Sequence, residues 1–279
     1  MFLTRLISGV VLLALSLFFV ISGGYFIGVF TLALSLIAYY EMAKALNILS
    51  KKSLMIMGFI SITLYYALLM IFEEQAALYM VMIVCFTVIG FLTAYVISFP
   101  KLNVSDTMSA VFAYIYAPVM LSFLPLTRYL PEGAYIVWMI YISSWGYDTC
   151  AYCVGTLTGK TVGNHKIFPK LSPKKSLEGI IGGVIGAVAI AWLYGHFVAE
   201  PRSGLADVSW ILAGIAAVGA LIAQVGDLAA SAVKRDKDIK DYSHLIPGHG
   251  GVLDRFDSMI FTAPITYFLA KIFLLAVKG

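Results

Sequence analysis

The sequence predicts an all-α polytopic membrane protein with about nine transmembrane helices, and three observations support this fold class. Hydrophobic residues make up 61% of the chain and charged residues only 12%. The mean hydropathy of +0.93 lies far outside the range of soluble domains. Long apolar runs recur at roughly the 20 residues that cross a bilayer core. Backbone groups in lipid must be hydrogen-bonded within their own segment, so we expect these runs to be helices.

Nine apolar runs are the expected spans. The first run is short, and the sixth and eighth each contain an aspartate, Asp148 and Asp227. A signal peptide is the alternative for the first run, but no clear small-x-small cleavage site follows it. The nine runs cover residues 6–22, 25–43, 54–72, 76–98, 107–125, 134–155, 178–198, 208–230 and 256–276.

The basic residues predict the orientation of these spans. With a cytosolic N-terminus, fifteen of the nineteen Lys and Arg residues fall in cytosolic segments and three fall outside. Cytosolic loops normally carry such an excess, and the opposite orientation would invert it. We therefore expect an N-terminus in the cytosol and an extracytoplasmic C-terminus. The expected location of the protein is the plasma membrane.

The chain divides into two parts by the distribution of its polar residues. Residues 1–130 contain about five spans with short loops, and we interpret them as a transmembrane scaffold. Residues 131–279 contain about four spans and two polar cytosolic loops, and we expect catalysis in this part.

Cys150 and Cys153 form a C-x-x-C pair in an apolar helix, where packing is the simpler interpretation; we expect no disulfide framework and no zinc site.

The first candidate site residue is Asp148, near the cytosolic end of the sixth span. A carboxylate within the membrane is energetically costly and is usually functional. The alternative is a hydrogen bond from a neighbouring hydroxyl, such as that of Tyr152.

The second candidate is the loop of residues 159–179, which contains five lysines and His165. Lysines bind phosphate groups and anionic lipid head groups, although the topology rule alone also explains them. Ser176, or the pair at 172–173, is expected to cap the following helix. Gly179, Gly182, Gly183 and Gly186 predict a close-packing helix face.

The third candidate is the stretch of residues 224–258. Asp227 lies just inside the cytosolic boundary, and Asp254 and Asp257 share one face where the ninth span begins. Acidic residues also suit a helix N-terminus, which is the simpler interpretation of that pair. Glycines around His249 allow close approach of an anion. Because Mg²⁺ is usually held by one or two carboxylates and phosphate oxygens, the stretch suggests a metal-bridged polyphosphate.

These residues resemble the phosphatidate cytidylyltransferases, also called CDP-diacylglycerol synthases. The family signature pairs Ser-x-x-Lys-Arg with a Lys-Asp five residues on, then His-Gly-Gly and Asp-Arg-x-Asp. The blocks "QVGDLAAS" and "SPKKSLEG" are similar to other polar blocks of the family, and Thr158 departs from it where an aromatic residue is expected. The resemblance covers about residues 140–260. The matching signature residues are Ser231, Lys234, Arg235, Lys240, Asp241, Pro247, His249, Gly250, Gly251, Asp254, Arg255 and Asp257.

The resemblance implies that CTP and phosphatidic acid react to give CDP-diacylglycerol and pyrophosphate at a cytosolic active site. It implies Mg²⁺, with a second cation as an option, held by Asp227 and Asp254 first and by Asp257 and Asp148 next. The expected catalytic residues are Asp227, Asp254, Lys234 and Arg235. The expected substrate-binding residues are Lys174, Lys175, Ser231, Lys240, Asp241, His249, Gly250, Gly251 and Arg255.

Three other classes of protein fit the sequence less well. A secondary transporter would place carboxylates and glycines near the bilayer midplane but would not need a basic cytosolic face. CDP-alcohol phosphotransferases use an Asp-Gly block that does not occur in this chain. A non-enzymatic scaffold predicts no intramembrane aspartates. We expect the lipid bilayer as a partner and no nucleic acid, and the small-residue helix faces are compatible with a homodimer.

Overall fold

The computed structural model describes residues 2–161, 163–203 and 207–278, so Gly279, at the predicted extracytoplasmic end, lies outside it. Throughout these ranges the chain forms helices joined by turns and loops, without a named strand. Within them, six helices are long and apolar enough to cross a membrane. The predicted fold class of a helical, multi-pass membrane protein is therefore confirmed at this level. The count of nine spans and the orientation of the ends stay predictions.

The chain forms two compact units, and neither is one continuous segment. The first unit contains residues 1–129 and 236–256, and the second contains residues 130–235 and 257–279. The polar loop that follows the eighth predicted span is thus placed with the N-terminal helices. Each unit is described by itself below.

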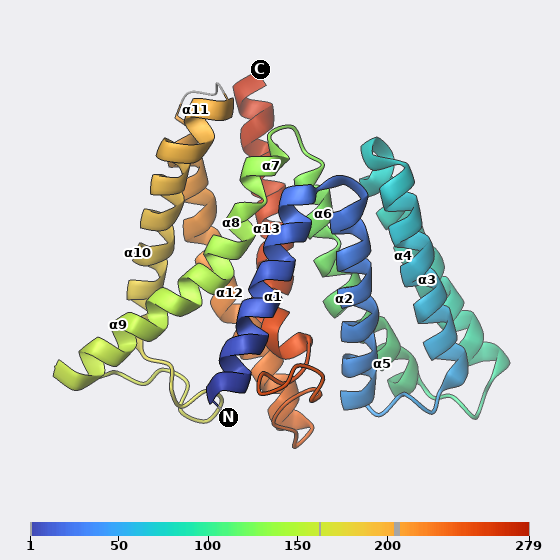
Figure 1. Cartoon of the computed structure of the whole chain (residues 1–279). Helices are drawn as coiled ribbons and strands as arrows, with labels where there is room; N and C mark the ends of the chain where they lie inside the picture. The colour runs from blue at the N-terminus through green and yellow to red at the C-terminus, as the bar shows by residue number, and fades with distance from the viewer. Residues whose placement is uncertain (1, 162, 204–206, 279) are drawn as a thin grey trace. The chain divides into compact units, whose positions relative to one another are not determined.

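The first unit is a bundle of apolar helices that pack side by side (Figure 1). Buried tyrosines fill its interior, and their hydroxyls pair with serines: Tyr66 with Ser35 at 2.7 Å and Tyr65 with Ser122 at 2.9 Å. Its main helices are α1 (Phe2–Ser22), α2 (Gly24–Ala45), α3 (Lys52–Ile71), α4 (Ala76–Ile97), α5 (Val104–Tyr114) and α6 (Phe123–Arg128).

One end of this first unit gathers its basic and polar segments. Lys44 lies in the last turn of α2, and Lys51 precedes α3 and pairs with Asp106 at 2.8 Å. The polar loop of residues 236–256 packs at the same end, because it contacts Glu41 near the end of α2 and Ser8 near the start of α1. The start of α1, the end of α2 and the loop therefore lie on one side of the bundle.

The second unit is built around a close pair of helices, α9 (Tyr147–Thr161) and α10 (Leu177–Tyr194). Ser176 caps α10, as predicted, by accepting a hydrogen bond from the backbone of Gly179 at 3.2 Å. The glycine face of α10 is also confirmed as a close contact. A Cβ on Gly183 would lie 2.6 Å from the Tyr147 ring, and one on Gly186 would lie 2.5 Å from the sulfur of Cys150.

The remaining helices of this unit include a broken span. The predicted span of residues 134–155 is divided into short helical segments before α9 begins, and one of these segments is a π-helical turn. The longest described helix, α12, ends at Asp236, where the polar loop begins, and α13 starts at Leu253, so the last residues of the 236–256 stretch form the first turn of α13. The pieces of the broken span are α7 (Gly133–Ile136), α8 (Trp138–Tyr141) and η3 (Ile142–Gly146). The other helices of this unit include α11 (Glu200–Ser203), α12 (Val208–Asp236) and the greater part of α13 (Leu253–Lys278).

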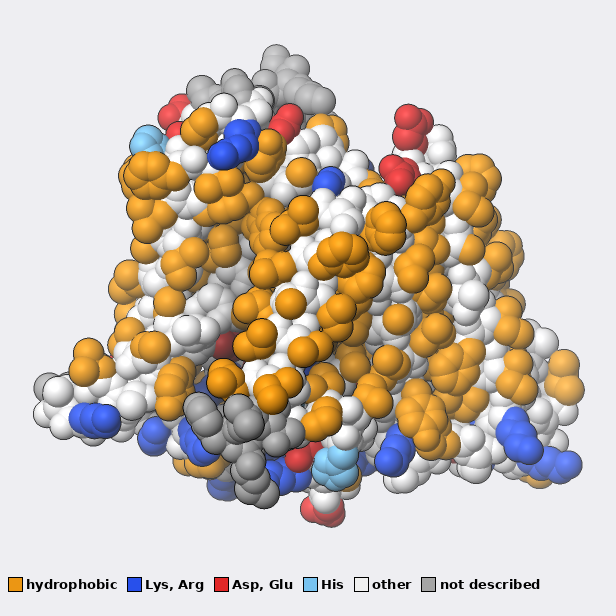
Figure 2. Space-filling model, viewed as in Figure 1, with side chains coloured by type: hydrophobic (Ala, Val, Ile, Leu, Met, Phe, Trp, Pro, Cys, Tyr) orange, Lys and Arg blue, Asp and Glu red, His pale blue; other side chains and the backbone are white. Residues whose placement is uncertain are grey.

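The surface of each unit suits a lipid environment. Hydrophobic side chains cover the helices along their length, and many Lys and Arg side chains gather toward helix ends (Figure 2). Exposed apolar residues include Ile97 at 78% and Leu78 at 68% on α4. Side chains of this kind are normally buried in a soluble protein, so their exposure indicates contact with lipid tails.

Candidate functional site

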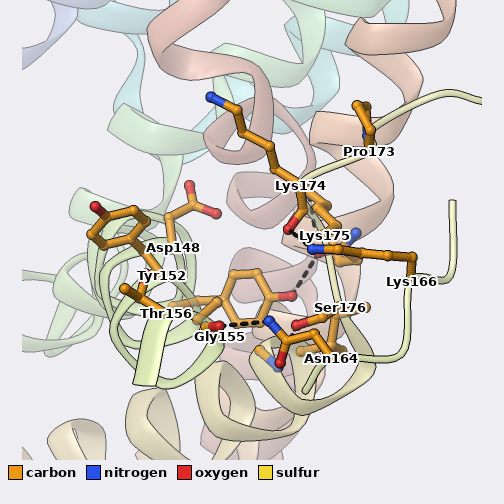
Figure 3. Close-up of a pocket in the computed structure, with 15 residues that line it drawn as sticks. Asp148, Tyr152, Gly155, Thr156, Asn164, Lys166, Pro173, Lys174, Lys175 and Ser176 are labelled. Carbon is orange, nitrogen blue, oxygen red and sulfur yellow. Dashed lines mark hydrogen bonds between the residues drawn. The ribbon is translucent and has the colours of Figure 1, made fainter. Parts of the chain in front are cut away.

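The second unit contains a cavity of about 440 Å³, which is lined by the first part of α9, the loop before α10, the start of α10 and Gln224 of α12. Asp148 and Tyr152 project from α9, and lysines of the connection between α9 and α10 face the same space (Figure 3). Most of the polar lining is basic or neutral, which favours an anionic ligand. The polar lining residues include Asp148, Asn164, Lys166, Lys174, Lys175, Ser176 and Gln224.

Lys175 is the centre of a hydrogen-bond network at this cavity. Its ammonium group pairs with the carboxylate of Asp227 and donates a hydrogen bond to Gln224 Oε1 at 3.0 Å. Tyr147 donates to the same oxygen at 2.7 Å. An ammonium group has no acceptor, so the Gln224 amide must present its oxygen to Lys175. Lys175 and Asp227 expose only 18% and 27% of their side chains, so solvent screens the pair incompletely.

Three of the predicted carboxylates are near enough in this unit for their charges to interact. Asp257, on the first part of α13, interacts electrostatically with Asp227, Asp148 and Lys234. Tyr147 interacts with the charges of Asp148 and Asp227. Among the described residues, no three His, Cys, Asp or Glu side chains close on one point as a ready-made metal site. The arrangement is a loose group of carboxylates compensated by lysines.

The first unit contains a second, polar cavity of about 510 Å³, formed by the loop of residues 236–256. A bridge between Ile246 and Gly250 closes a tight turn around His249. Basic side chains outnumber acidic ones in its lining, so this cavity also suits an anion. The lining residues are Lys240, Asp241, His244, Ile246, Gly248, His249, Gly250 and Arg255.

The side chain of His249 is oriented by α1. Ser8 Oγ donates to the carbonyl of Pro247 at 2.9 Å and lies 2.7 Å from His249 Nδ1. These two contacts tie the turn around His249 to the start of α1, and the tautomer of the ring decides which atom of the Ser8–His249 pair donates.

Asp254 organises the turn that precedes α13. Its Oδ2 accepts hydrogen bonds from the backbone of Tyr242 at 2.8 Å and of Gly251 at 2.9 Å, and the residue is buried. Gly250 has a φ of +85°, and a Cβ there would lie 2.8 Å from this same oxygen. The loop therefore needs glycine at this position. The Gly251 amide, which we expected to contact an anion, donates to Asp254 instead.

The predicted site residues are thus divided between two environments. One contains Asp148, Lys174, Lys175, Asp227, Lys234 and Asp257, and the other contains Lys240, Asp241, His249, Gly250, Gly251, Asp254 and Arg255. Ser231 is half-buried on α12 and Arg235 is exposed near its end, and neither lines a described cavity. Asp227 and Asp254 belong to different units, so their shared metal stays a prediction.

Sequence reasoning missed two residues of these sites. Gln224 lies within the block "QVGDLAAS" but carries no charge. Its only signal in the sequence is a polar side chain within an apolar run. Glu41 lies in the predicted span of residues 25–43, where a carboxylate is itself a signal of function. Its partners are far away in the sequence, on the loop before α13.

The fold and these two cavities define a class of protein: an integral membrane protein with cation-rich, carboxylate-bearing sites at helix ends, suited to phosphate compounds. The chain belongs to the cytidylyltransferase family, which it matches over residues 3–273. It is 30% identical to the phosphatidate cytidylyltransferase of Bacillus subtilis strain 168, over 96% of this chain and 97% of the relative. The proteins of that name from Staphylococcus aureus strain COL and Staphylococcus epidermidis strain ATCC 35984 are 31% and 32% identical; each match covers 94% of this chain and 96% of the relative.

Proposed function

We propose that this chain is a membrane-embedded phosphatidate cytidylyltransferase, which converts CTP and phosphatidate into CDP-diacylglycerol and pyrophosphate. The observation that carries the proposal is the end-to-end similarity to phosphatidate cytidylyltransferases, which spans both cavities and not the signature alone. The lysine-rich lining of the cavities suits the phosphates of both substrates, and the exposed apolar helices suit a lipid substrate.

The reaction needs positioning and charge neutralisation more than acid–base chemistry. A phosphate oxygen of phosphatidate attacks the α-phosphorus of CTP and forms a new P–O bond. The P–O bond between the α-phosphorus and the oxygen that bridges to the β-phosphate breaks, and pyrophosphate leaves with that oxygen. The attacking oxygen is already an anion, so no general base is required. Lysine and arginine side chains lower the repulsion between the two anions and stabilise the charge that develops on the leaving group.

Specific residues suit these tasks. Lys174, Lys175 and Lys234 are proposed to contact phosphates in the second unit, and Lys240 and Arg255 in the first. His249 orients a phosphate through a ring nitrogen and does not act as a base. Arg235 and Ser231 keep their predicted roles at the end of α12, and Asp241 is proposed to contact substrate from the loop.

The donor set also fits Mg²⁺. This ion binds oxygen ligands, keeps several waters and typically uses one or two protein carboxylates with substrate phosphates. The carboxylates of Asp148, Asp227 and Asp257 interact in the second unit, and Asp254 offers another. When bound, Mg²⁺ would neutralise the triphosphate; a second cation is an option that the same carboxylates allow. Asp227, which pairs with Lys175, is one of the carboxylates that would hold the ion.

We further propose the membrane arrangement predicted from the sequence: nine spans, a cytosolic N-terminus, a cytosolic active site and a location in the plasma membrane. Support comes from the first unit, where the start of α1, the basic end of α2 and the polar loop share one side. A homodimer is compatible with the small-residue helix faces and stays a prediction.

The test is an assay of the purified protein in detergent with CTP, phosphatidate and Mg²⁺, measuring pyrophosphate and the lipid product together. Both products should appear in equal amounts and only when all three components are present. Pyrophosphate release without phosphatidate, or no CDP-diacylglycerol with a folded protein, would contradict the proposal.

A further inference from the structure

A buried carboxyl group in the N-terminal helices contacts the loop of residues 236–256. Glu41, near the end of α2, is 1% exposed. Its Oε1 accepts hydrogen bonds from the Ser243 hydroxyl at 2.5 Å and from the Val252 backbone at 3.0 Å. Its Oε2 accepts one from the Leu253 backbone at 2.8 Å. All of these residues belong to the first unit, so the contact lies within one compact body.

These hydrogen bonds engage the N-terminus of α13. The first backbone N–H groups of a helix have no partner within the helix, and a negative charge there is favourable. Here Glu41 takes the N–H groups of Val252 and Leu253, and Asp254 takes that of Gly251. Three consecutive N–H groups are therefore held by two carboxyl groups, one of which comes from a helix some two hundred residues earlier in the chain.

The approach is close enough to determine the local sequence. A Cβ on Gly251 would lie 2.5 Å from Glu41 Oε1 and 2.7 Å from its Cδ. The second glycine of the His-Gly-Gly stretch thus gives Glu41 access to the turn, while the first provides the positive φ beside Asp254. A carboxyl group thus lies against the backbone at each glycine: that of Asp254 at Gly250 and that of Glu41 at Gly251.

We infer that Glu41 is a positioning residue of the proposed cytidylyl transfer: it fixes the first turn of α13 and, through it, the place of Asp254 and the basic cavity around His249 and Arg255. The inference rests on the proposed function, because it assigns the loop a role in catalysis. Glu41 itself does not line the polar cavity formed by residues 236–256. It acts on the substrates only through the backbone of residues 251–253. The N-terminal helices are then part of the catalytic apparatus.

The test uses Glu41→Gln and Glu41→Asp in the full-length protein. Glutamine keeps the size of the side chain but replaces one acceptor by an NH₂ group, which then faces a backbone N–H donor. Aspartate keeps both acceptors on a side chain one methylene shorter. The matched control is Ser35→Ala on the same helix, which removes a buried hydrogen bond to Tyr66 away from the loop.

Two readouts separate positioning from general stability. The first is kcat per folded protein: Glu41→Gln should lose about 10–100-fold, as for other residues that orient a catalytic ligand, and Glu41→Asp should recover part of this loss. The second is hydrogen–deuterium exchange, in which the amides of residues 251–253 should exchange faster in Glu41→Gln. Ser35→Ala should leave both readouts near wild type.

The possible outcomes are distinct. Wild-type kcat in Glu41→Gln, or unchanged exchange at residues 251–253, would overturn the inference. An equal loss of kcat in Ser35→Ala would also overturn it, because destabilisation of α2 would then suffice. If the wild-type protein makes no CDP-diacylglycerol, the proposed function fails; the exchange experiment still shows whether Glu41 holds the turn.

Discussion

Replacing Lys175 by methionine should disable the enzyme while leaving it folded. Methionine keeps most of the length and apolar surface of the side chain and removes only the ammonium group. That group contacts both Asp227 and Gln224, so its loss removes an ion pair and a hydrogen bond at once. Under the proposed mechanism, it also removes a cation that contacts a substrate phosphate.

The size of the effect follows from these contacts. A hydrogen bond to a charged group contributes about 1.5–3 kcal/mol, and a tenfold change in rate corresponds to about 1.4 kcal/mol. The ion pair is only 18% and 27% exposed, so screening by solvent lowers this range little. Loss of one electrostatic contact to the transition state typically costs about 10²–10³ in rate. The first range corresponds to about 10–10²-fold in rate and the second to about 10²–10³-fold, so we expect kcat/KM to fall by about 10²-fold, where the two meet.

The assay is CDP-diacylglycerol formation at several Mg²⁺ concentrations, with the folded fraction measured by size-exclusion chromatography in detergent. Lys174→Met is the matched control, because Lys174 lines the same cavity and makes no ion pair in the described part of the chain. It should lose less activity than Lys175→Met. Equal losses would mean that only the net charge of the cavity matters, and near-wild-type kcat/KM in Lys175→Met would refute the assigned role.

Further expectations concern the metal, the helix packing and the topology. Asp227→Asn and Asp254→Asn should each lose at least about 10²-fold in turnover. The double variant should be little worse than either single one if the two carboxylates act as a unit. If the losses are additive across a Mg²⁺ titration, the two carboxylates act independently and do not share one ion. Gly183→Ala should destabilise the protein by about 1–3 kcal/mol, because its Cβ would lie 2.6 Å from the Tyr147 ring, whereas Gly214→Ala, with no atom within 4 Å, should not lower the melting temperature. A reporter fused to the C-terminus should be extracytoplasmic, and cytosolic activity of the reporter would reverse the predicted orientation.

Local features were predictable where short-range chemistry decides them. The Ser176 cap and the glycine face of α10 depend on residues three or four positions apart, so the sequence contains the whole pattern. The carboxylates were found because a charge in an apolar run is costly wherever the run packs. The family resemblance supplied the reaction, which spacing alone did not define.

Long-range contacts were not predictable in the same way. No local pattern indicates that the loop of residues 236–256 packs with the N-terminal helices, because Glu41 and Ser8 meet it across more than two hundred positions. The sequence consequently indicates a transmembrane scaffold for residues 1–130 and no contact with the polar loop. The place of Asp254 was equally hidden, since its two backbone partners are set by the fold of the turn.

The division of the chain bears on how this enzyme is cut, fused or shortened. The polypeptide passes from one unit to the other at residues 129–130, 235–236 and 256–257. Cleavage between residues 129 and 130 therefore does not yield a complete structural unit. A fragment of residues 1–129 would leave Glu41 in the bundle without the amides of Val252 and Leu253 that satisfy it. Chimeras between relatives should therefore take the N-terminal helices and residues 236–256 from the same relative, because these two stretches form one compact unit.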